Sequence, residues 1–377
     1  MPTSTSQSIF LARQARLDEA ITAHGFDALA LNPGSSLTYL TGLGFHLMER
    51  PVTAIFAPGQ PVTVILPELE RLKLEGLSFP VRSFAFGEDP ARWPDAFAAA
   101  LQAAGVSRQK IAVEPTRLRF LELRMLEAAA PAASFVSGEA LLSALRISKD
   151  EQEVAAMRTA VEIAQQALQA TLPFVQPGKT ERQIAAELTL QLLRHGSEPE
   201  MAFSPIVSGG PNSANPHASP SDRPLQTGDL LVIDWGAIYH GYVSDLTRTF
   251  AIGPVDAEYT RIAEIVKAAN AAGRLAAGPG VAAQEVDRAA RDVIEQAGYG
   301  QYFTHRTGHG IGLEGHEPPY MREGNDLALQ PGMAFTVEPG IYLPGRNGVR
   351  IEDNVVITVG GAETLSNLPR ELITLPV

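Results

Sequence analysis

The chain has 377 residues, 45% of them hydrophobic and 19% charged, and a formal net charge of −12. This composition excludes an extended disordered chain and a basic nucleic-acid-binding surface, and the length predicts two folded domains because single cores rarely grow beyond about 250–300 residues. Cysteine is absent, which excludes thiol catalysis and zinc–thiolate sites and leaves carboxylates and histidines as candidate metal ligands.

The chain begins MPTSTSQSIFLARQ, which has neither the basic start nor the apolar stretch of a secretory leader. No window reaches the roughly 18 consecutive apolar residues of a membrane-spanning helix. Together with the absence of cysteine, these features predict a soluble cytoplasmic protein without membrane or nucleic-acid partners.

Residues 10–136 alternate between helical and extended patterns, beginning with ARLDEAITAHG and DALAL. Such alternation is typical of an α/β fold, so we expect an α/β domain over residues 1–145. Within it, NPGSSLTYLTGLGF at residues 32–45 lacks the lysine and the spacing of a phosphate-binding loop, and we interpret it as a structural loop.

A predicted domain boundary lies at residues 137–150. Beside it, Ser148 with Glu151 forms a candidate capping box, in which two side chains three residues apart satisfy the first free amide groups of a helix. Thr180 with Gln183 forms a second box, so a helix is expected to begin at each place.

The second domain, residues 146–377, is predicted to be α+β with antiparallel hairpins. Strands are expected over residues 203–252, helices near 256–276 and 282–297, and strands again from about residue 303. The order of strands, helices and hairpins occurs twice, which predicts two similar halves.

The stretch GDLLVIDWGAIYHGYVSDLTRTF, residues 228–250, places two acidic residues inside patterns typical of strands. If the turn is centred between Tyr239 and His240, Asp234 and Asp245 lie directly opposite each other on one face, with Cβ atoms about 4.5–5.5 Å apart. Two carboxylates so close on a half-buried sheet require a proton or a cation between them.

The later stretch MAFTVEPGIYLPGRNGVRIEDNVVITV repeats this arrangement. Glu338 and Glu352 flank a Pro/Gly turn, and a hairpin centred at residue 345 would place them opposite each other, although a bulge at Pro339 and Gly340 would shift the register. Four carboxylates match the charge of two divalent cations, and a carboxylate-rich set suits metals such as Mn²⁺. The sequence therefore predicts a dinuclear site equipped for hydrolysis.

Between the hairpins, the segment THRTGHGIGLEGHEPPYM contains His305, His309 and His316. A single histidine is most often structural, but three in a Gly-rich segment without helical period indicate a site. The glycines would let the backbone approach a ligand closely.

Four motifs then match a known family: DWGAIYHGYVSDLTRTF, GHGIGLEGHE, TVEPGIY and GVRIEDN. In this order and spacing they resemble the pita-bread metallopeptidase superfamily of methionine aminopeptidase, aminopeptidase P, prolidase and creatinase. The resemblance covers residues 148–377, and residues 10–145 resemble the amino-terminal domain of the creatinase and prolidase branch. It implies an α/β amino-terminal domain followed by an α+β pita-bread catalytic domain.

The resemblance also implies a role for each site residue. The implied metal ligands are Asp234, Asp245, His309, Glu338 and Glu352, with Asp245 and Glu352 bridging the ions and Glu338 also acting as general base. The implied catalytic and substrate-binding residues are His217 and His316, which contact substrate and stabilise the tetrahedral intermediate, His305 in the wall of the proline site, and Arg350, which orients these groups through carboxylates.

Two features bear on specificity. Gly315 stands where many relatives carry Val, which is expected to widen the substrate site. Gly209, Gly210 and Asn212 resemble a loop that approaches the substrate amine, but a common Gly/Asn turn explains them equally well.

The first hypothesis is therefore a metal-dependent exopeptidase of the Xaa-Pro class, either prolidase or aminopeptidase P. It would hydrolyse small peptides through a hydroxide shared by two divalent ions, with Mn²⁺ preferred over Co²⁺ or Zn²⁺, and the resemblance favours a homodimer. The alternatives are a creatinase-like amidinohydrolase, which uses this fold without metal, and a non-enzymatic pita-bread module that binds peptides. The complete ligand set counts against both.

Overall fold

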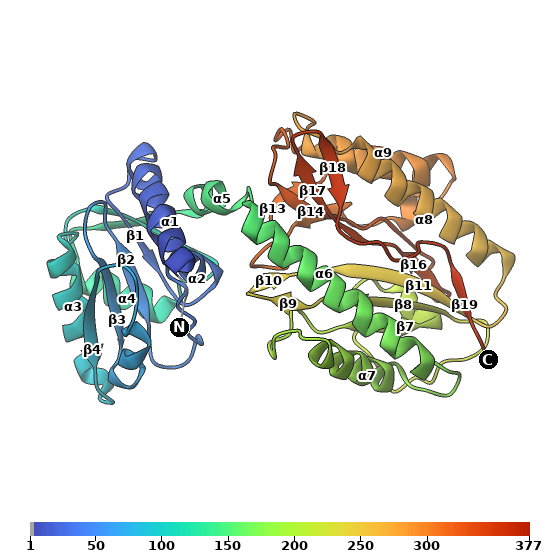
Figure 1. Ribbon diagram of the computed structural model, residues 1–377, viewed down its shortest axis with the longest axis horizontal. Helices are drawn as coiled ribbons and strands as arrows, with labels where there is room; N and C mark the ends of the chain where they lie inside the picture. The colour runs from blue at the N-terminus through green and yellow to red at the C-terminus, as the bar shows by residue number, and fades with distance from the viewer. Residues whose placement is uncertain (1–3) are drawn as a thin grey trace. The chain divides into compact units, whose positions relative to one another are not determined.

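The computed structural model describes residues 4–377, and their side chains from residue 9. The chain divides into two compact units, Met1–Arg146 and Ile147–Val377, each with its own sheets (Figure 1). The expected α/β domain followed by an α+β domain is confirmed.

The first unit is built on one mixed six-stranded sheet in the order β4-β3-β2-β1-β5-β6. Helix α3 shows how the sequence builds it, because Pro94 lies at its start, Gly105 at φ 73° ends it, and Phe97 and Leu101 are fully buried in the core of the unit. The strands are β1 (Ala28–Leu31), β2 (Thr53–Phe56), β3 (Val62–Pro67), β4 (Val81–Phe86), β5 (Lys110–Val113) and β6 (Ser134–Ser137). The helices are α1 (Ser4–Ala23), α2 (Ser35–Thr41), η1 (Glu68–Leu74), η2 (Pro90–Arg92), α3 (Trp93–Ala104), α4 (Phe120–Ala129) and α5 (Glu139–Arg146).

The interpretation of residues 32–45 as a loop is wrong for their central part. Helix α2 occupies Ser35–Thr41, where Leu37 and Leu40 are buried, and Gly42 at φ 71° ends it. The Gly and Ser residues thus flank and begin a short helix, whose apolar side chains join the core.

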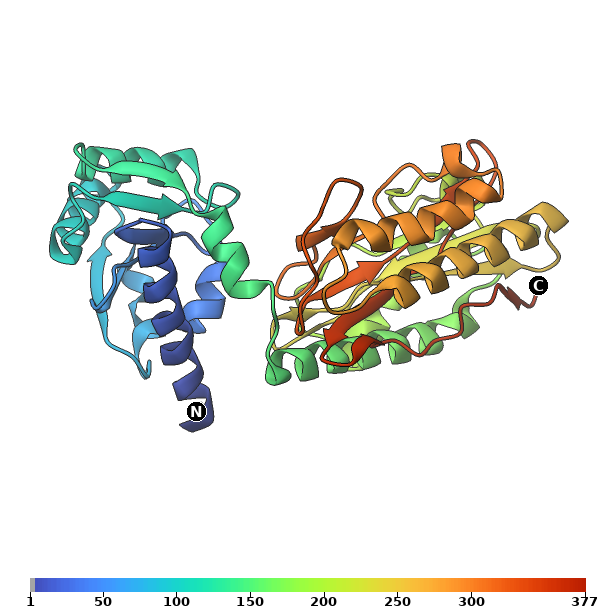
Figure 2. The same cartoon turned by 90° about the horizontal axis from the view of Figure 1, so that it is seen from above.

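The second unit contains two pairs of long helices. Figures 1 and 2 show α6 and α7 on one side of the strands and α8 and α9 on the other. The helices are α6 (Glu151–Thr171), η3 (Leu172–Phe174), α7 (Glu181–Arg194), η4 (Gly210–Ala214), α8 (Ala257–Ala276), α9 (Ala283–Gln296) and η5 (Gly300–Tyr302). In each half two helices precede a hairpin, so the expected repeat is confirmed.

The strands of this unit form a four-stranded sheet, β19-β11-β8-β7, a five-stranded sheet, β13-β12-β14-β17-β18, and two short pairs, β9 with β10 and β15 with β16. The first half contains β7 (Ile206–Gly209), β8 (Leu230–Trp235), β9 (Ile238–Tyr239), β10 (Tyr242–Val243) and β11 (Leu246–Ile252). The remaining strands are β12 (Gly308–Gly310), β13 (Glu317–Met321), β14 (Ala334–Val337), β15 (Gly340–Tyr342), β16 (Gly348–Arg350), β17 (Asp353–Thr358), β18 (Gly361–Thr364) and β19 (Ile373–Leu375).

The two predicted capping boxes have different outcomes. The box of Thr180 and Gln183 at the start of α7 is confirmed. Helix α6 instead begins two residues later than expected, because Asp150 accepts the amides of Gln152 and Glu153 and the Glu153 side chain returns to the Asp150 amide. An aspartate caps a helix as well as a serine does, so a motif with two candidate caps does not settle where the helix starts.

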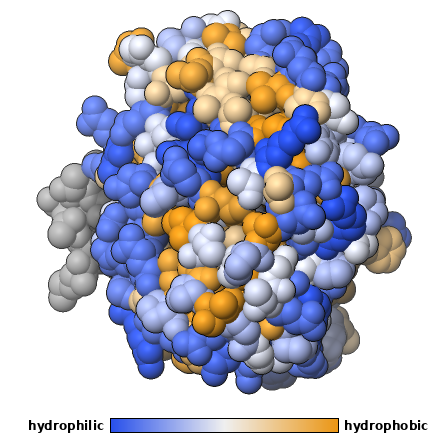
Figure 3. All heavy atoms as spheres, turned by 90° about the vertical axis from the view of Figure 1, so that its right-hand side faces the viewer, coloured by the Kyte–Doolittle hydropathy of each residue, from blue (hydrophilic) through white to orange (hydrophobic). Residues whose placement is uncertain are grey.

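The described residues include no helix that is both long enough and apolar enough to cross a bilayer. On the face drawn in Figure 3, apolar residues form several patches separated by charged and polar residues.

Candidate metal centre

The first hairpin has a register that differs from the expected one. Asp234 pairs with Thr247, and the turn is centred between His240 and Gly241, which both have positive φ, 50° and 78°. Positive φ at both central residues is the conformation of a type I′ hairpin turn, and Gly241 adopts it without strain. Asp234 is therefore not directly opposite Asp245, but the shift of two residues leaves both on one face of the hairpin.

The second hairpin has the expected register. Val337 pairs with Asp353 on one side of the Pro339 segment, and Gly340 pairs with Arg350 on the other. Both pairs have their midpoint at residue 345, so the segment with Pro339 does not shift the register, and Glu338 and Glu352 occupy opposite positions.

The two hairpins lie side by side because their backbones and side chains bond to each other. The Glu352 amide donates to the Thr247 carbonyl at 3.1 Å, and the Thr247 hydroxyl donates to Glu352 Oε2 at 2.7 Å. The buried Asn354 side chain accepts the Asp245 amide at 3.0 Å and donates to the Asp245 carbonyl at 2.8 Å. These contacts bring the acidic residues of both hairpins to one place.

Three overlapping groups of side chains have ligand atoms within 4.8 Å of one another. They are Asp234, Asp245 and Glu352; His309, Glu338 and Glu352; and Asp245, His309 and His316. Asp245, His309 and Glu352 each belong to two groups, so the groups adjoin one another as the ligands of two neighbouring ions would. His309 Nδ1 donates to the Gly310 carbonyl at 3.1 Å, which leaves Nε2 facing Glu338 Oε1 at 3.3 Å.

Two carboxylate oxygens in these groups fit a cation directly. Asp234 Oδ1 and Glu352 Oε1 are buried and have no hydrogen-bond partner within the described chain. A buried oxygen without a partner is costly, and oxygen-rich ligand sets of this kind suit hard or borderline divalent ions. The residues present therefore fit a divalent metal centre.

The pKa values of these acids in the metal-free protein also fit a cation site. Burial raises the pKa of Asp245 and of Glu352 well above their usual values, and neighbouring carboxylates raise both further. Burial also raises the pKa of Glu338 to about 7, although Arg350 opposes the shift. Without a cation, these groups tend to keep protons that a metal would displace.

Arg350 connects the acids to the histidines. It donates to Asp234 Oδ2 at 2.5 Å, to the Thr247 hydroxyl at 3.1 Å and to the Tyr342 hydroxyl at 3.1 Å. Tyr342 in turn lies 2.8 Å from His305 Nε2. Since the Tyr342 oxygen already accepts from Arg350, its single proton is directed at His305.

This arrangement fixes the state of His305. Nε2 accepts from Tyr342, so Nδ1 carries the proton and donates to the Arg306 carbonyl at 2.7 Å. Burial lowers the pKa of His305 to about 4, which keeps the ring neutral. Because protein groups use both nitrogens, the ring presents its carbon atoms to the cavity.

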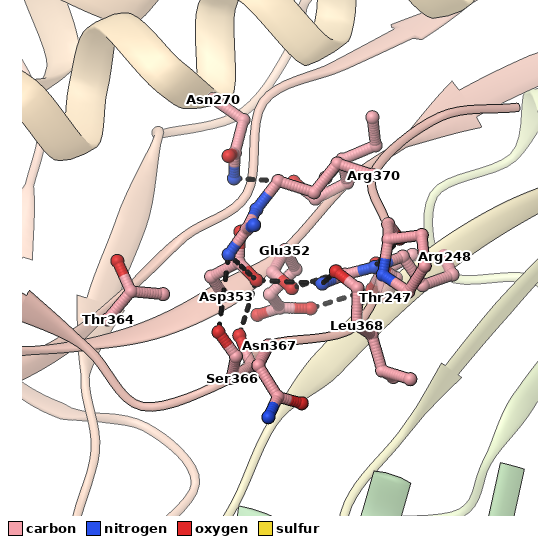
Figure 4. Close-up of polar contacts among 12 residues, drawn as sticks. Thr247, Arg248, Asn270, Glu352, Asp353, Thr364, Ser366, Asn367, Leu368 and Arg370 are labelled. Carbon is pink, nitrogen blue, oxygen red and sulfur yellow. Dashed lines mark hydrogen bonds and ion pairs between the residues drawn. The ribbon is translucent and has the colours of Figure 1, made fainter. Parts of the chain in front are cut away.

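A second network of hydrogen bonds and ion pairs holds the backbone at Glu352 and the side chain of Asp353 (Figure 4). Arg248 donates to the Glu352 carbonyl at 2.7 Å and to Asp353 Oδ1 at 2.9 Å, and Arg370 donates to Asp353 at 2.7 and 3.0 Å. Burial alone would raise the pKa of Asp353, but Arg248 and Arg370 outweigh it and lower that pKa to about 2. A permanent charge network thus fixes the residue next to Glu352.

One cavity of about 740 Å³ is lined by all nine residues that the sequence implied as metal ligands or as catalytic and substrate-binding residues. These residues are His217, Asp234, Asp245, His305, His309, His316, Glu338, Arg350 and Glu352. Gly315 lies in the same wall, and a methyl group added there would meet no atom within 4 Å. Gly209, Gly210 and Asn212 are not among the lining residues, which favours the turn interpretation for them.

Several further residues, not singled out from the sequence, also line this cavity. Arg306 lines it and has its guanidinium 3.5 Å from His316 Nδ1 and 4.4 Å from the ring centre of Tyr320. Its position between two candidate histidines was a usable signal. Phe203 and Ile206 also line the cavity, but no local pattern marks them.

Comparisons with known proteins agree with this geometry. Residues 155–359 match the model of metallopeptidase family M24, and residues 13–148 match the creatinase/prolidase N-terminal domain. The chain is 41% identical to a probable dipeptidase PepE of Mycobacterium tuberculosis, over 97% of each chain, and 35% identical to an Xaa-Pro dipeptidase of Pyrococcus horikoshii, over 95% and 97%. A prolidase structure from Thermococcus sibiricus superposes with a TM-score of 0.92 at 35% identity, over 97% and 99% of the chains.

Proposed function

The chain belongs to metallopeptidase family M24, and we propose that this peptidase is an exopeptidase that cleaves Xaa-Pro dipeptides. The family implies divalent metal ions and a peptide substrate. The relatives named dipeptidase or Xaa-Pro dipeptidase support the substrate class. The observation that carries the proposal is the single cavity lined by all nine expected residues.

We propose Asp234, Asp245, His309, Glu338 and Glu352 as the metal ligands, and Mn²⁺ as the preferred ion. The support is the overlap of the three ligand groups and the two unpartnered buried oxygens. When bound, two such ions supply a hydroxide at neutral pH and polarise the scissile carbonyl.

The other side chains would then act on protons and orientation. Glu338 lines the cavity with its Oε1 3.3 Å from His309 Nε2, and it is proposed to accept a proton at its carboxylate and pass it on. His316 and His217 line the same cavity as the acids and are proposed to donate to the developing oxyanion. Arg350 holds Asp234 in place, and the neutral ring of His305 forms part of the wall.

Arg306 favours dipeptides over longer peptides. The free carboxylate of an Xaa-Pro dipeptide lies one residue beyond the scissile bond, and a half-buried guanidinium in the cavity wall is the side chain best suited to bind it. In a tripeptide the same position carries an amide, which gains less from a cation. We therefore place this protein with dipeptidases rather than aminopeptidases.

Neither alternative function gains support. An amidinohydrolase that works without metal gives no reason for the carboxylate set, and neither does a module that only binds peptides. The cytoplasmic location and the homodimer stay part of the proposal, to be tested by cell fractionation and by light scattering.

The decisive experiment is a substrate panel with added Mn²⁺ and product identification. Xaa-Pro dipeptides should be cleaved faster than Xaa-Pro-Xaa tripeptides, and dipeptides without proline should be poor substrates. Arg306→Met should raise KM for dipeptides and not for tripeptides, while Arg322→Met, on an exposed arginine, serves as the control. Equal cleavage of all peptides, or activity indifferent to chelator, would refute the proposal.

A further inference from the structure

The loop of residues 209–221 forms one wall of the cavity and contains His217. Its residues 216–220 all line the cavity, yet between β7 and β8 the loop has only the short helix η4 as regular structure. A loop of this kind needs side-chain contacts to keep one conformation.

One buried carboxylate holds both ends of this loop. Glu181, the first residue of α7, is 0% exposed. Its oxygens accept from the Gly209 amide at 2.7 Å, from Asn212 Nδ2 at 3.0 Å, and from the amide and hydroxyl of Ser221 at 2.9 and 2.6 Å. A carboxylate in the first turn of a helix is also stabilised by the helix dipole.

The middle of the loop is held by two residues of strand β16. Arg350 Nη1 donates to the Pro216 carbonyl at 3.1 Å, next to His217, and the Gly348 amide donates to the Ser213 hydroxyl at 2.8 Å. The loop is thus fastened to Glu181 at its ends and to strand β16 in its middle. The cavity-lining segment, residues 216–220, is itself held at its first residue by the Arg350 contact.

We infer that Glu181 is a positioning residue for catalysis: it fixes the loop of residues 209–221 so that His217 faces the substrate. The carboxylate itself is not among the cavity-lining residues. Glutamine has the same shape but would point an amide NH₂ group at donors, so it cannot accept all four hydrogen bonds. The inference deepens the proposed function and rests on it for the role of His217.

The test is a double-mutant cycle with the metal-loaded full chain and an Xaa-Pro dipeptide. Glu181→Gln should lower kcat/KM by about ten- to a hundredfold, the range expected when charge-assisted hydrogen bonds are lost. In a His217→Ala background the same substitution should change kcat/KM by about twofold or less, because the group that it positions is gone. Full additivity of the two effects would overturn the inference.

A matched control separates positioning from general stability. Glu153 is also a buried carboxylate near the start of a helix, bonded to the Tyr242 hydroxyl at 2.6 Å and absent from the cavity wall. Glu153→Gln should lower the unfolding temperature and leave kcat/KM near wild type. Bound metal, measured by elemental analysis, should be unchanged in Glu181→Gln; loss of metal would mean that the effect does not pass through His217.

A substrate-free measurement keeps the inference separate from the proposed function. Hydrogen exchange of peptides covering residues 209–221 should become faster in Glu181→Gln and stay unchanged in Glu153→Gln, and unchanged exchange in both would overturn the inference. If the wild type does not cleave Xaa-Pro dipeptides, the proposed function fails while this measurement still stands. If Glu181→Gln does not fold, Ser221→Ala, which removes one donor to the same carboxylate, takes its place in every arm.

Discussion

The two hairpins of the metal centre reach the same result in different ways. In the first, Asp234 and Asp245 are offset by two positions around a tight turn at His240 and Gly241. In the second, Glu338 and Glu352 are directly opposite each other across a longer turn. What both share is that their acids lie on one face, because strand side chains alternate with a period of two. The site therefore requires that the two acids of a hairpin lie on the same face, and it does not require that they lie directly opposite each other.

The hairpins also hold each other's acids. Arg350 of the second hairpin bonds to Asp234 of the first, and Thr247 of the first bonds to Glu352 of the second. Asp234 and Glu352 are thus each held by a side chain from the other hairpin. Substitutions in either hairpin are therefore expected to disturb the metal centre.

The largest effect is expected from Asp245→Ala, which removes the proposed bridging residue of the first hairpin. Hydrolysis should be abolished, while the unfolding temperature of the metal-free protein should stay level or rise, because a buried acid whose pKa is raised by burial and by its neighbours is removed. Activity assays and thermal unfolding in chelator measure both. Residual activity near wild type would refute the bridging role.

His316→Ala tests whether His316 is a metal ligand or a substrate-binding residue. The His316 ring lies 3.9 Å from the His309 ring, centre to centre, and belongs to one ligand group. If His316 stabilises the oxyanion, kcat should fall by about 10²–10³-fold, with bound metal near wild type. Elemental analysis of the purified variant decides, since loss of metal would make His316 a ligand.

Thr247→Val breaks the contact between the hairpins without removing a ligand. The affinity for Mn²⁺ should fall by about 10- to 100-fold, as for other groups that orient a metal ligand. Thr249→Val on the same strand is the control, because Thr249 bonds to the backbone of Arg350 and to no carboxylate. Equal metal affinity in both variants, measured by titration calorimetry, would show that Thr247 does not orient Glu352.

A smaller effect concerns pH and the metal-free protein. Burial raises the folded-state pKa of Glu338 to about 7, above the unfolded value of about 4.3. The folded state then binds the proton more tightly, so this contribution to stability is full below the unfolded pKa and is lost as pH rises towards 7. The unfolding temperature in chelator should fall between pH 5 and 7.5, less so in Glu338→Gln, and an equal fall in both would contradict the assignment.

The smallest effect is expected at Gly315. A side chain there points into open cavity space, so Gly315→Val should fold normally and lower kcat/KM for dipeptides with bulky residues by about tenfold at most, with little change for Gly-Pro. Gly44→Val, at another glycine with open space and in the other unit, is the control. An unchanged order of preference across the panel would show that this wall does not select substrates.

Much of the catalytic unit could be predicted because its signals are local. The helix start at Thr180, the centre of the second hairpin at residue 345 and the shared face of each acidic pair follow from spacing within a few tens of residues. The capping of α6 by Asp150 and the helix within residues 32–45 were missed because neighbouring residues compete for the same local role.

The sequence by itself determined which residue types the centre contains and on which face of each strand they lie. The tertiary structure alone decided the register at Asp234, the pairing of Arg350 with that residue, and the carboxylate of Glu181 that fixes the loop around His217. Alternation along a strand is a property of neighbouring residues, whereas a turn with positive φ and an ion pair between distant segments depend on how the whole chain packs.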